Sequence, residues 1–143
     1  MDESRKAPPV GGLLETALYV ADLGVSVAFY RDVIGLPVML QNARMAALDA
    51  GRGEVVLLFR KGATSEDMTD ATGTVPGHEG EGRLHMAFAI AGTDLEAWRA
   101  HLIACGLSLA GEVHWRRGGT SLYVRDPDGH AIEFATPGLW PNR

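Results

Sequence analysis

The chain has 143 residues and a formal net charge of −5, with 46% hydrophobic and 22% charged residues. This length suits one domain or two small fused modules, and it is enough to bury an ordinary apolar core. The acidic balance and the lack of a basic stripe in the sequence argue against nucleic acid or an acidic membrane surface as a partner. The composition is that of a common globular protein.

Neither the chain start nor the cysteine content points to a secreted or membrane-bound protein. No apolar run reaches the ~18 residues that span a bilayer. The polar lead at 1–12, which we expect to be flexible, resembles neither a signal peptide nor an anchor. The one cysteine, Cys105, excludes an intramolecular disulfide framework. We therefore expect a soluble, cytoplasmic protein.

A first module is predicted at 13–60, followed by a polar linker at 61–82. Its predicted elements are, in chain order, a strand at 13–20, a helix that begins after Asp22 and ends before Gly35, and strands at 37–42, 45–50 and 54–60.

The same order begins again at 83–143, which holds a second module and the C-terminal tail. Its predicted elements are a strand at 83–90, a helix opened by the capping box Thr93-x-x-Glu96 and ended by Gly106, and strands at 109–114, 119–125 and 130–136. The two halves thus share one βαβββ order, which indicates an internal repeat. Alignment of the repeats places Glu15 over His85 and Leu57 over Glu133.

Three predicted strands each carry one residue that can bind a metal. Side chains alternate between the two faces of a strand. Glu15, His85 and Glu133 therefore lie on the face opposite the apolar one, each beside small alanines. If the two modules pair into a curved cup, these three side chains line its interior.

Two carboxylates and an imidazole suit a divalent cation. Two bare carboxylates that lie close together repel, so the pKa of one must rise. A cation removes that conflict, and Glu oxygens with a His nitrogen suit Zn²⁺, Mn²⁺, Fe²⁺, Co²⁺ or Ni²⁺ at roughly 2.0–2.2 Å. The residues predicted to line a substrate pocket are Tyr19, Leu57, Phe59, His114, Trp115, Tyr123 and Arg125.

Simpler interpretations exist for the same residues. Glu133 suits a solvated strand face, His85 suits a core, and Glu15 suits an ion pair with an arginine of the cup. Elsewhere, Cys105 is expected to be a small core residue, and His78 in the linker is expected to be solvated.

Three segments resemble the vicinal oxygen chelate superfamily, which includes glyoxalase I, extradiol dioxygenases, fosfomycin-resistance proteins, methylmalonyl-CoA epimerase and bleomycin-resistance proteins. They are LYVADLGVSVAFYRDVIGL, LHMAFAI and YVRDPDGHAIEFATP, and the resemblance covers about 13–140. It implies an α+β fold in which two βαβββ modules form a curved, cup-like mixed β-sheet with helices outside.

The resemblance also implies where metal ligands stand, on the first and last strands of each module. Those positions here are Glu15, Leu57, His85 and Glu133. Because leucine cannot bind a metal, the four-ligand pattern of glyoxalase I is broken and three ligands remain.

Two functions are compatible with this resemblance. One is a divalent-metal-dependent enzyme that chelates vicinal oxygens of a small substrate, with Glu15 or a metal-bound water as base. The reaction type (lyase, isomerase, transferase or dioxygenase) stays open. The alternative is a metal-free, bleomycin-resistance-type protein that binds a drug through aromatic rings and carboxylates. The resemblance implies a homodimer, since in several relatives the cup combines modules of two chains.

Overall fold

The computed structural model describes residues 6–143, so residues 1–5 of the predicted lead lie outside the described part. The elements of the first half are β1 (Glu15–Val20), α1 (Leu23–Ala28), the π-helical η1 (Phe29–Val33), β2 (Val38–Gln41), β3 (Met45–Gly51) and β4 (Glu54–Arg60). Those that follow are β5 (Met68–Asp70), β6 (Gly73–Val75), β7 (His85–Ala89), the 3₁₀ turn η2 (Gly92–Asp94), α2 (Leu95–Ala104), β8 (Gly111–His114), β9 (Thr120–Arg125) and β10 (Ala131–Ala135).

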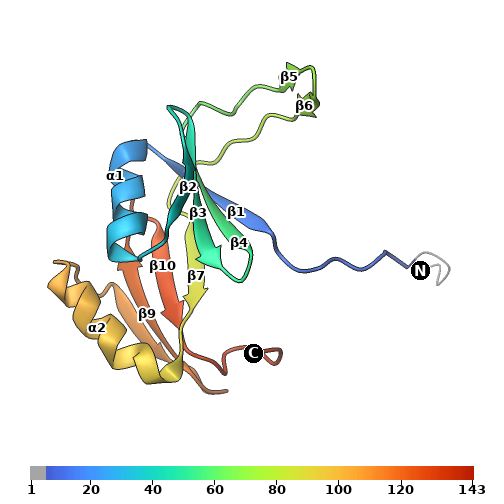
Figure 1. The fold of residues 1–143 in the computed structure, drawn as a ribbon. Helices are drawn as coiled ribbons and strands as arrows, with labels where there is room; N and C mark the ends of the chain where they lie inside the picture. The colour runs from blue at the N-terminus through green and yellow to red at the C-terminus, as the bar shows by residue number, and fades with distance from the viewer. Residues whose placement is uncertain (1–5) are drawn as a thin grey trace.

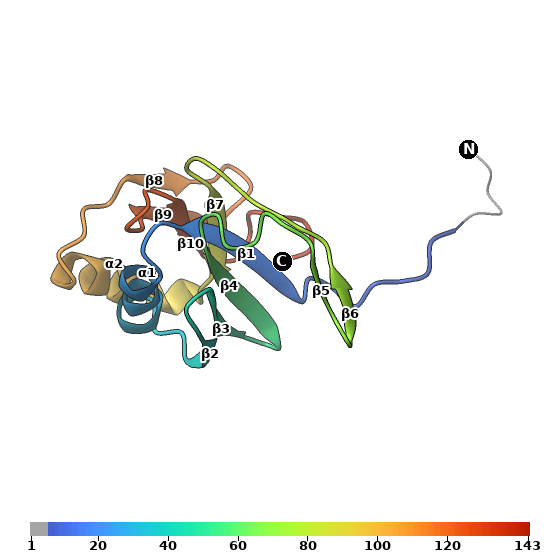
Figure 2. The ribbon, with the colours of Figure 1, turned by 90° about the horizontal axis from the view of Figure 1, so that it is seen from above.

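Two four-stranded mixed sheets carry the fold, and their strand orders are equivalent. The first sheet runs β1-β4-β3-β2 and the second runs β7-β10-β9-β8. Both helices lie on the same side of the molecule (Figures 1 and 2). The predicted α+β fold with helices outside the sheets is therefore confirmed.

The pairing of the first and last strands shows the repeat residue by residue. β1 and β4 are parallel, with Ala17 opposite Leu57. β7 and β10 are also parallel, with Ala87 opposite Glu133. Leu57 and Glu133 thus occupy equivalent positions in the two sheets, as the alignment of the repeats places them.

One apolar core joins the two halves. Its fully buried side chains come from both sheets and both helices, and include Leu48, Leu58, Leu102, Leu122 and Phe134. Burial of one such side chain is worth about 1.5–3 kcal/mol, so the shared core favours a fixed arrangement of the two modules. None of the helices within 6–143 has the length and apolar character to cross a lipid bilayer.

Two local predictions about helices are resolved by hydrogen bonds. Asp22 caps α1 as expected, because its carboxylate accepts a hydrogen bond from the Val25 amide at 3.1 Å. The predicted capping box is wrong. η2 precedes α2, no side-chain cap bond forms at Asp94, and the Glu96 carboxylate instead accepts from Arg99 Nε at 3.1 Å.

The segment 61–82, predicted to be a linker without strands, contains a short hairpin. β5 and β6 pair antiparallel and project away from the two sheets (Figure 1). Asp70 holds the turn, because its carboxylate accepts from the amide and the hydroxyl of Thr72 at 2.7 and 2.6 Å. These bonds lower the pKa of Asp70.

Cys105 is exposed, so its predicted place in the core is wrong. Within α2 only Leu102 is buried in the core, and Cys105 lies at the C-terminal cap, beyond the part of the helix that packs on the core.

The turn between β9 and β10 is built around one buried carboxylate. Asp126 Oδ1 accepts from the amides of Asp128 and His130 at 2.9 and 2.8 Å. Gly129 has a φ of +83°, a conformation that favours glycine. The side chains of Asp126, Asp128 and His130 all leave this turn toward the first module.

This turn holds the two modules together, and we call its three side chains the inter-module clamp. Asp128 accepts from the Ala21 amide at 2.8 Å and from the Ser26 hydroxyl at 3.2 Å. Asp126 Oδ2 accepts from the Tyr30 hydroxyl at 2.7 Å. His130 Nδ1 accepts from the Leu84 amide at 2.8 Å, so its Nε2 carries the proton and donates to the Tyr19 carbonyl at 2.9 Å.

Replacement of Tyr30 tests the clamp. Tyr30 is fully buried, and Tyr30→Phe removes the donor to the Asp126 carboxylate while it keeps the ring. We expect the free energy of unfolding to fall by about 1.5–3 kcal/mol, the range for a bond to a charged group. Urea unfolding measures this. The matched control is Asp32→Asn, which loses an exposed pair with Arg31 and should change little.

The same variant should change stability in alkali. Burial, followed by the nearby Asp126 carboxylate, raises the pKa of Tyr30 far above its ordinary 10.0. The unfolded chain then ionises first, so stability is complete below pH 10 and falls as the pH rises above it. Tyr30→Phe should therefore lose stability less steeply above pH 10 than the wild type. Parallel slopes for the two proteins would contradict this role.

Candidate metal site

His85 and Glu133 meet on the second sheet, on the face opposite the core. β7 and β10 pair so that His85 stands opposite Ala131, two residues before Glu133. The His85 Nε2 atom lies 3.2 Å from Glu133 Oε1. The Glu133 side chain is only 6% exposed, whereas that of His85 is 54% exposed. The pair is therefore open to solvent from the histidine side.

A backbone contact decides which nitrogen of His85 carries the proton. Its Nδ1 lies 2.8 Å from the carbonyl oxygen of Ala131, and a carbonyl only accepts hydrogen bonds. Nδ1 therefore holds the proton, and in the neutral ring Nε2 presents its lone pair to Glu133 Oε1. Two acceptors that face each other at this distance require a proton, on the ring or on the carboxyl group, or a metal ion between them.

The other oxygen of Glu133 is held from inside the sheet. The Ser121 hydroxyl donates to Glu133 Oε2 at 2.5 Å, and the Trp115 indole donates to the Ser121 oxygen at 2.8 Å. Tyr123 stands opposite Glu133 and stacks on His85 with a centroid distance of 6.2 Å. Burial, and then the charge of Glu133, raises the pKa of Tyr123.

Arg125 shares this face of the sheet, because it pairs with Ala131. Its guanidinium donates to the Gly129 carbonyl at 3.0 Å. The predicted pocket residues Trp115, Tyr123 and Arg125 therefore all lie on the side that carries His85 and Glu133.

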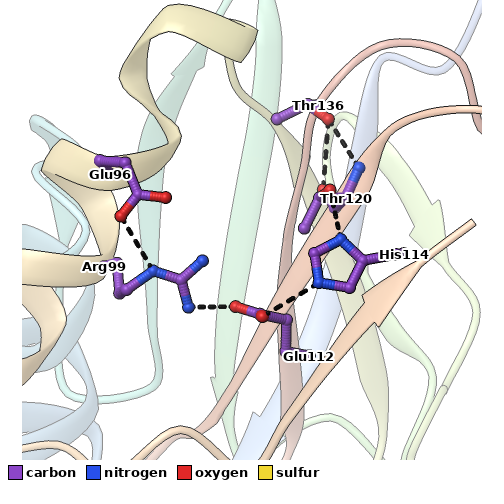
Figure 3. Close-up of polar contacts among 6 residues, drawn as sticks. All are labelled: Glu96, Arg99, Glu112, His114, Thr120 and Thr136. Atoms are coloured by element: carbon purple, nitrogen blue, oxygen red, sulfur yellow. Dashed lines mark hydrogen bonds and ion pairs between the residues drawn. The ribbon is translucent and has the colours of Figure 1, made fainter.

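His114 lies on the opposite face. It pairs with Thr120, whereas Val113 pairs with Ser121. Figure 3 shows its ring between Thr120 and Glu112, at 3.2 Å from each, while Glu112 binds Arg99 of α2. The hydrogen bond from Arg99 lowers the pKa of Glu112. The prediction that His114 lines the substrate pocket is therefore wrong, because the register of β8 turns its side chain away from the face of His85 and Glu133.

Glu15 is exposed and stays apart from the pair within one chain. In 6–143, only Asp126, Asp128 and His130 form a group of three or more potential ligands whose atoms all lie within 4.8 Å of one another. Glu15 instead lines a cleft of about 310 Å³ between β1 and β7, and neither His85 nor Glu133 lines it.

The inter-module clamp is compact enough to hold an ion, but its donor atoms already have partners. Both nitrogens of His130 are hydrogen-bonded to backbone groups. Each carboxylate oxygen of Asp126 and Asp128 accepts at least one hydrogen bond. We interpret this group as the joint between the modules, as its position suggests, and not as a metal centre.

On the first sheet, the linker covers two predicted pocket residues. Phe59 is buried, because the His78 ring packs edge-on against it at 4.7 Å between centroids. The Tyr19 hydroxyl lies 2.7 Å from His78 Nδ1. His78 is thus half-buried and bonded, and the prediction that it is solvated is wrong. Leu57 stands opposite Ala17 and remains half-buried.

A glycine marks this crossing of the linker. A Cβ atom at Gly80 would lie 2.4 Å from the Tyr19 ring, so the chain passes where no larger residue fits. The sequence does not predict this contact, because Gly80 is one of several glycines in the segment 61–82.

The sequence is similar to proteins of one known superfamily. A profile of the Glyoxalase/Bleomycin resistance protein/Dioxygenase superfamily matches residues 12–134. A probable lactoylglutathione lyase of Vibrio parahaemolyticus is 31% identical over 136 residues, covering 87% of this chain and 89% of that protein. A metallothiol transferase FosB of Bacillus licheniformis is 26% identical over 126 residues, covering 87% of this chain and 75% of that protein.

A solved structure is also similar to this chain in fold and in sequence. The crystal structure of lactoylglutathione lyase from Agrobacterium tumefaciens has a TM-score of 0.85 and 31% identity, and the match covers 94% of this chain and 99% of that chain. The chain belongs to the glyoxalase/bleomycin resistance protein/dioxygenase superfamily. The relatives named here are lyases and a transferase, so membership alone leaves the reaction type open.

The tautomer of His85 is directly measurable. Long-range ¹H–¹⁵N correlation of the metal-free protein should show a proton on Nδ1 of His85, which leaves Nε2 as the nitrogen that faces Glu133. The bond to the Ala131 carbonyl is the cause. His85→Ala assigns the signal. A bare Nδ1 would mean that the ring does not donate to the Ala131 carbonyl, and Nε2 would then not be the nitrogen left to bind a metal.

Proposed function

We propose that the protein is a divalent-metal-dependent enzyme that chelates two neighbouring oxygens of a small substrate. The observation that supports this most is the facing pair of acceptors, His85 Nε2 and Glu133 Oε1, at 3.2 Å. Two ligand atoms that each lie about 2.1 Å from one metal ion stand about 3.0–3.4 Å apart in octahedral or tetrahedral geometry. The pair has that separation.

His85 and Glu133 would hold the metal with Glu15 as the third ligand. Zn²⁺, Mn²⁺, Fe²⁺, Co²⁺ and Ni²⁺ all accept this ligand set. When bound, such an ion supplies Lewis-acid stabilisation to an oxyanion of the substrate. Leu57 stands at the position equivalent to Glu133, so the site has one protein ligand fewer than the four-ligand glyoxalase I pattern and leaves room for a chelating substrate.

We propose that Glu15 reaches this site from a second copy of the chain, in a homodimer. Within one chain Glu15 does not join His85 and Glu133. Exposed apolar side chains lie close to it in sequence and on the edge strand β2: Leu13, Leu14, Met39 and Leu40 are between 51% and 83% exposed. The order β1-β4-β3-β2 places these two groups at opposite edges of the first sheet, so each edge offers exposed apolar side chains to a partner.

The chain's own residues would divide the work in the cup. Tyr123 and Arg125 lie beside the metal pair on the same face and would orient the substrate, with Trp115 at its edge. Glu15 would take a proton from the substrate as general base when it is not bound to metal. Leu57, on the opposite module, would contact the apolar part of the substrate. A cytoplasmic location fits the exposed, unpaired thiol of Cys105.

A metal-free binding protein is the second candidate, and one observation favours it. Tyr123 stacks on His85 next to the buried Glu133 carboxylate, and Trp115 is 38% exposed at the same surface. Aromatic faces beside a carboxylate bind organic cations. Metal analysis of the purified protein separates the two candidates.

Metal content tests the site directly. Wild-type protein loaded with Zn²⁺ or Mn²⁺ and then desalted should retain about one ion per chain, measured by plasma mass spectrometry. His85→Ala and Glu133→Gln should each lower retention at least tenfold, because each removes a ligand. His114→Ala is the matched control, since its ring lies on the other face of the sheet. Equal retention in all four proteins would contradict the proposed metal site.

Mixed dimers test where Glu15 acts. Glu15→Ala and Glu133→Gln chains should each bind metal weakly alone. Co-expressed with two different tags and purified through both, they should regain about half of the wild-type metal content, because one of the two cups then holds all three ligands. Absence of any recovery in a mixed dimer would show that both residues serve the same chain.

A further inference from the structure

Glu133 is the last member of a directional hydrogen-bond chain that begins at Trp115. The Trp115 indole nitrogen lies 2.8 Å from Ser121 Oγ, and Ser121 Oγ lies 2.5 Å from Glu133 Oε2. Ser121 is fully buried and Glu133 nearly so. The proposed metal does not account for the two donors in this chain.

The chemistry of the three groups fixes the direction of both bonds. An indole N–H only donates, so the Ser121 oxygen must accept from Trp115. The hydroxyl hydrogen of Ser121 is then available for the carboxylate, which accepts when ionised. One oxygen of Glu133 is thereby occupied from inside the sheet, and only Oε1 faces His85.

The turn between β8 and β9 and the C-terminal tail fix the position of the Trp115 backbone. The turn between β8 and β9 closes with hydrogen bonds from the Trp115 amide to the Gly119 carbonyl, at 3.0 Å, and from the Gly118 amide to the Trp115 carbonyl, at 3.1 Å. A Cβ atom at Gly119 would lie 2.7 Å from the Pro137 carbonyl oxygen. The C-terminal tail therefore packs directly on the turn, and only glycine fits there.

We propose that Ser121 and Trp115 are positioning residues, which orient Glu133 so that it binds the metal through Oε1 alone. This inference rests on the proposed metal-dependent function. When one oxygen of a carboxylate accepts a hydrogen bond, the side chain is held in one rotamer and only the other oxygen is free to bind the metal. One coordination position of the metal is then left for the substrate. Partners of this kind, one bond removed from the metal, tune affinity without contact to the ion.

Metal affinity gives the first test. Ser121→Ala should weaken Co²⁺ or Zn²⁺ binding by about 10–100-fold, measured by calorimetry. Trp115→Phe keeps a ring but removes the donor, so a smaller loss of about 2–10-fold is expected, the worth of one neutral hydrogen bond. Trp140→Phe is the matched control, because Trp140 is 67% exposed and has no part in the chain of bonds. Circular dichroism and thermal unfolding verify that each variant is folded.

Tryptophan fluorescence gives a readout that a merely structural role would not move. Metal binding withdraws electron density from Glu133, which weakens the bond that Glu133 accepts from Ser121. The environment of Trp115 then changes, so its emission should change with the same midpoint as the calorimetric titration. The change should persist in Trp140→Phe and vanish in Trp115→Phe. In Ser121→Ala it should vanish or shrink even at metal saturation.

The outcomes separate this inference from the function on which it rests. If the wild type binds no divalent metal, the proposed function and the positioning role both fail. If the wild type binds metal while Ser121→Ala binds with unchanged affinity, only the positioning role is wrong. If Ser121→Ala does not fold, Trp115→Phe decides: unchanged affinity together with a persistent fluorescence response overturns the inference.

Discussion

The contact on which the account depends is the approach of His85 Nε2 to Glu133 Oε1 at 3.2 Å. It follows from the parallel register of β7 and β10 together with the bond from His85 Nδ1 to the Ala131 carbonyl. That bond removes the only proton of a neutral ring from the nitrogen that faces the carboxylate. A buried carboxylate opposite a lone pair is costly unless a cation lies between them. The local geometry therefore requires a proton or a metal ion between Nε2 and Oε1.

The second constraint is the inter-module clamp, which fixes how the two sheets meet. Asp126, Asp128 and His130 bind backbone and hydroxyl groups of the first module, and a shared core supports them. With the modules arranged in this way, Glu15 of residues 6–143 does not cluster within 4.8 Å with His85 and Glu133. Completion of the site by Glu15 of a second copy is consistent with this arrangement.

Much of this was predictable from the sequence, and the exceptions have physical causes. Strand periodicity and the repeat place Glu15, His85, Leu57 and Glu133 on defined faces, and the pairing of Leu57 with Ala17 and of Glu133 with Ala87 agrees. The face of His114 was not predictable, because it depends on the register of β8 against β9. The contact of His78 with Tyr19 joins residues 59 positions apart in the chain, and no local pattern predicts it. Strand patterns do not predict whether Glu15 meets His85 and Glu133, because they carry no information on how modules or chains associate.

The most direct test is anomalous X-ray diffraction from crystals grown with Zn²⁺ or Co²⁺. The account predicts one anomalous peak per chain within about 2.2 Å of His85 Nε2 and Glu133 Oε1, with Glu15 of a second copy as the third protein ligand and Glu133 Oε2 still bonded to Ser121. A crystal with no anomalous peak between His85 and Glu133, or with a peak only at Asp126 and Asp128, would contradict it.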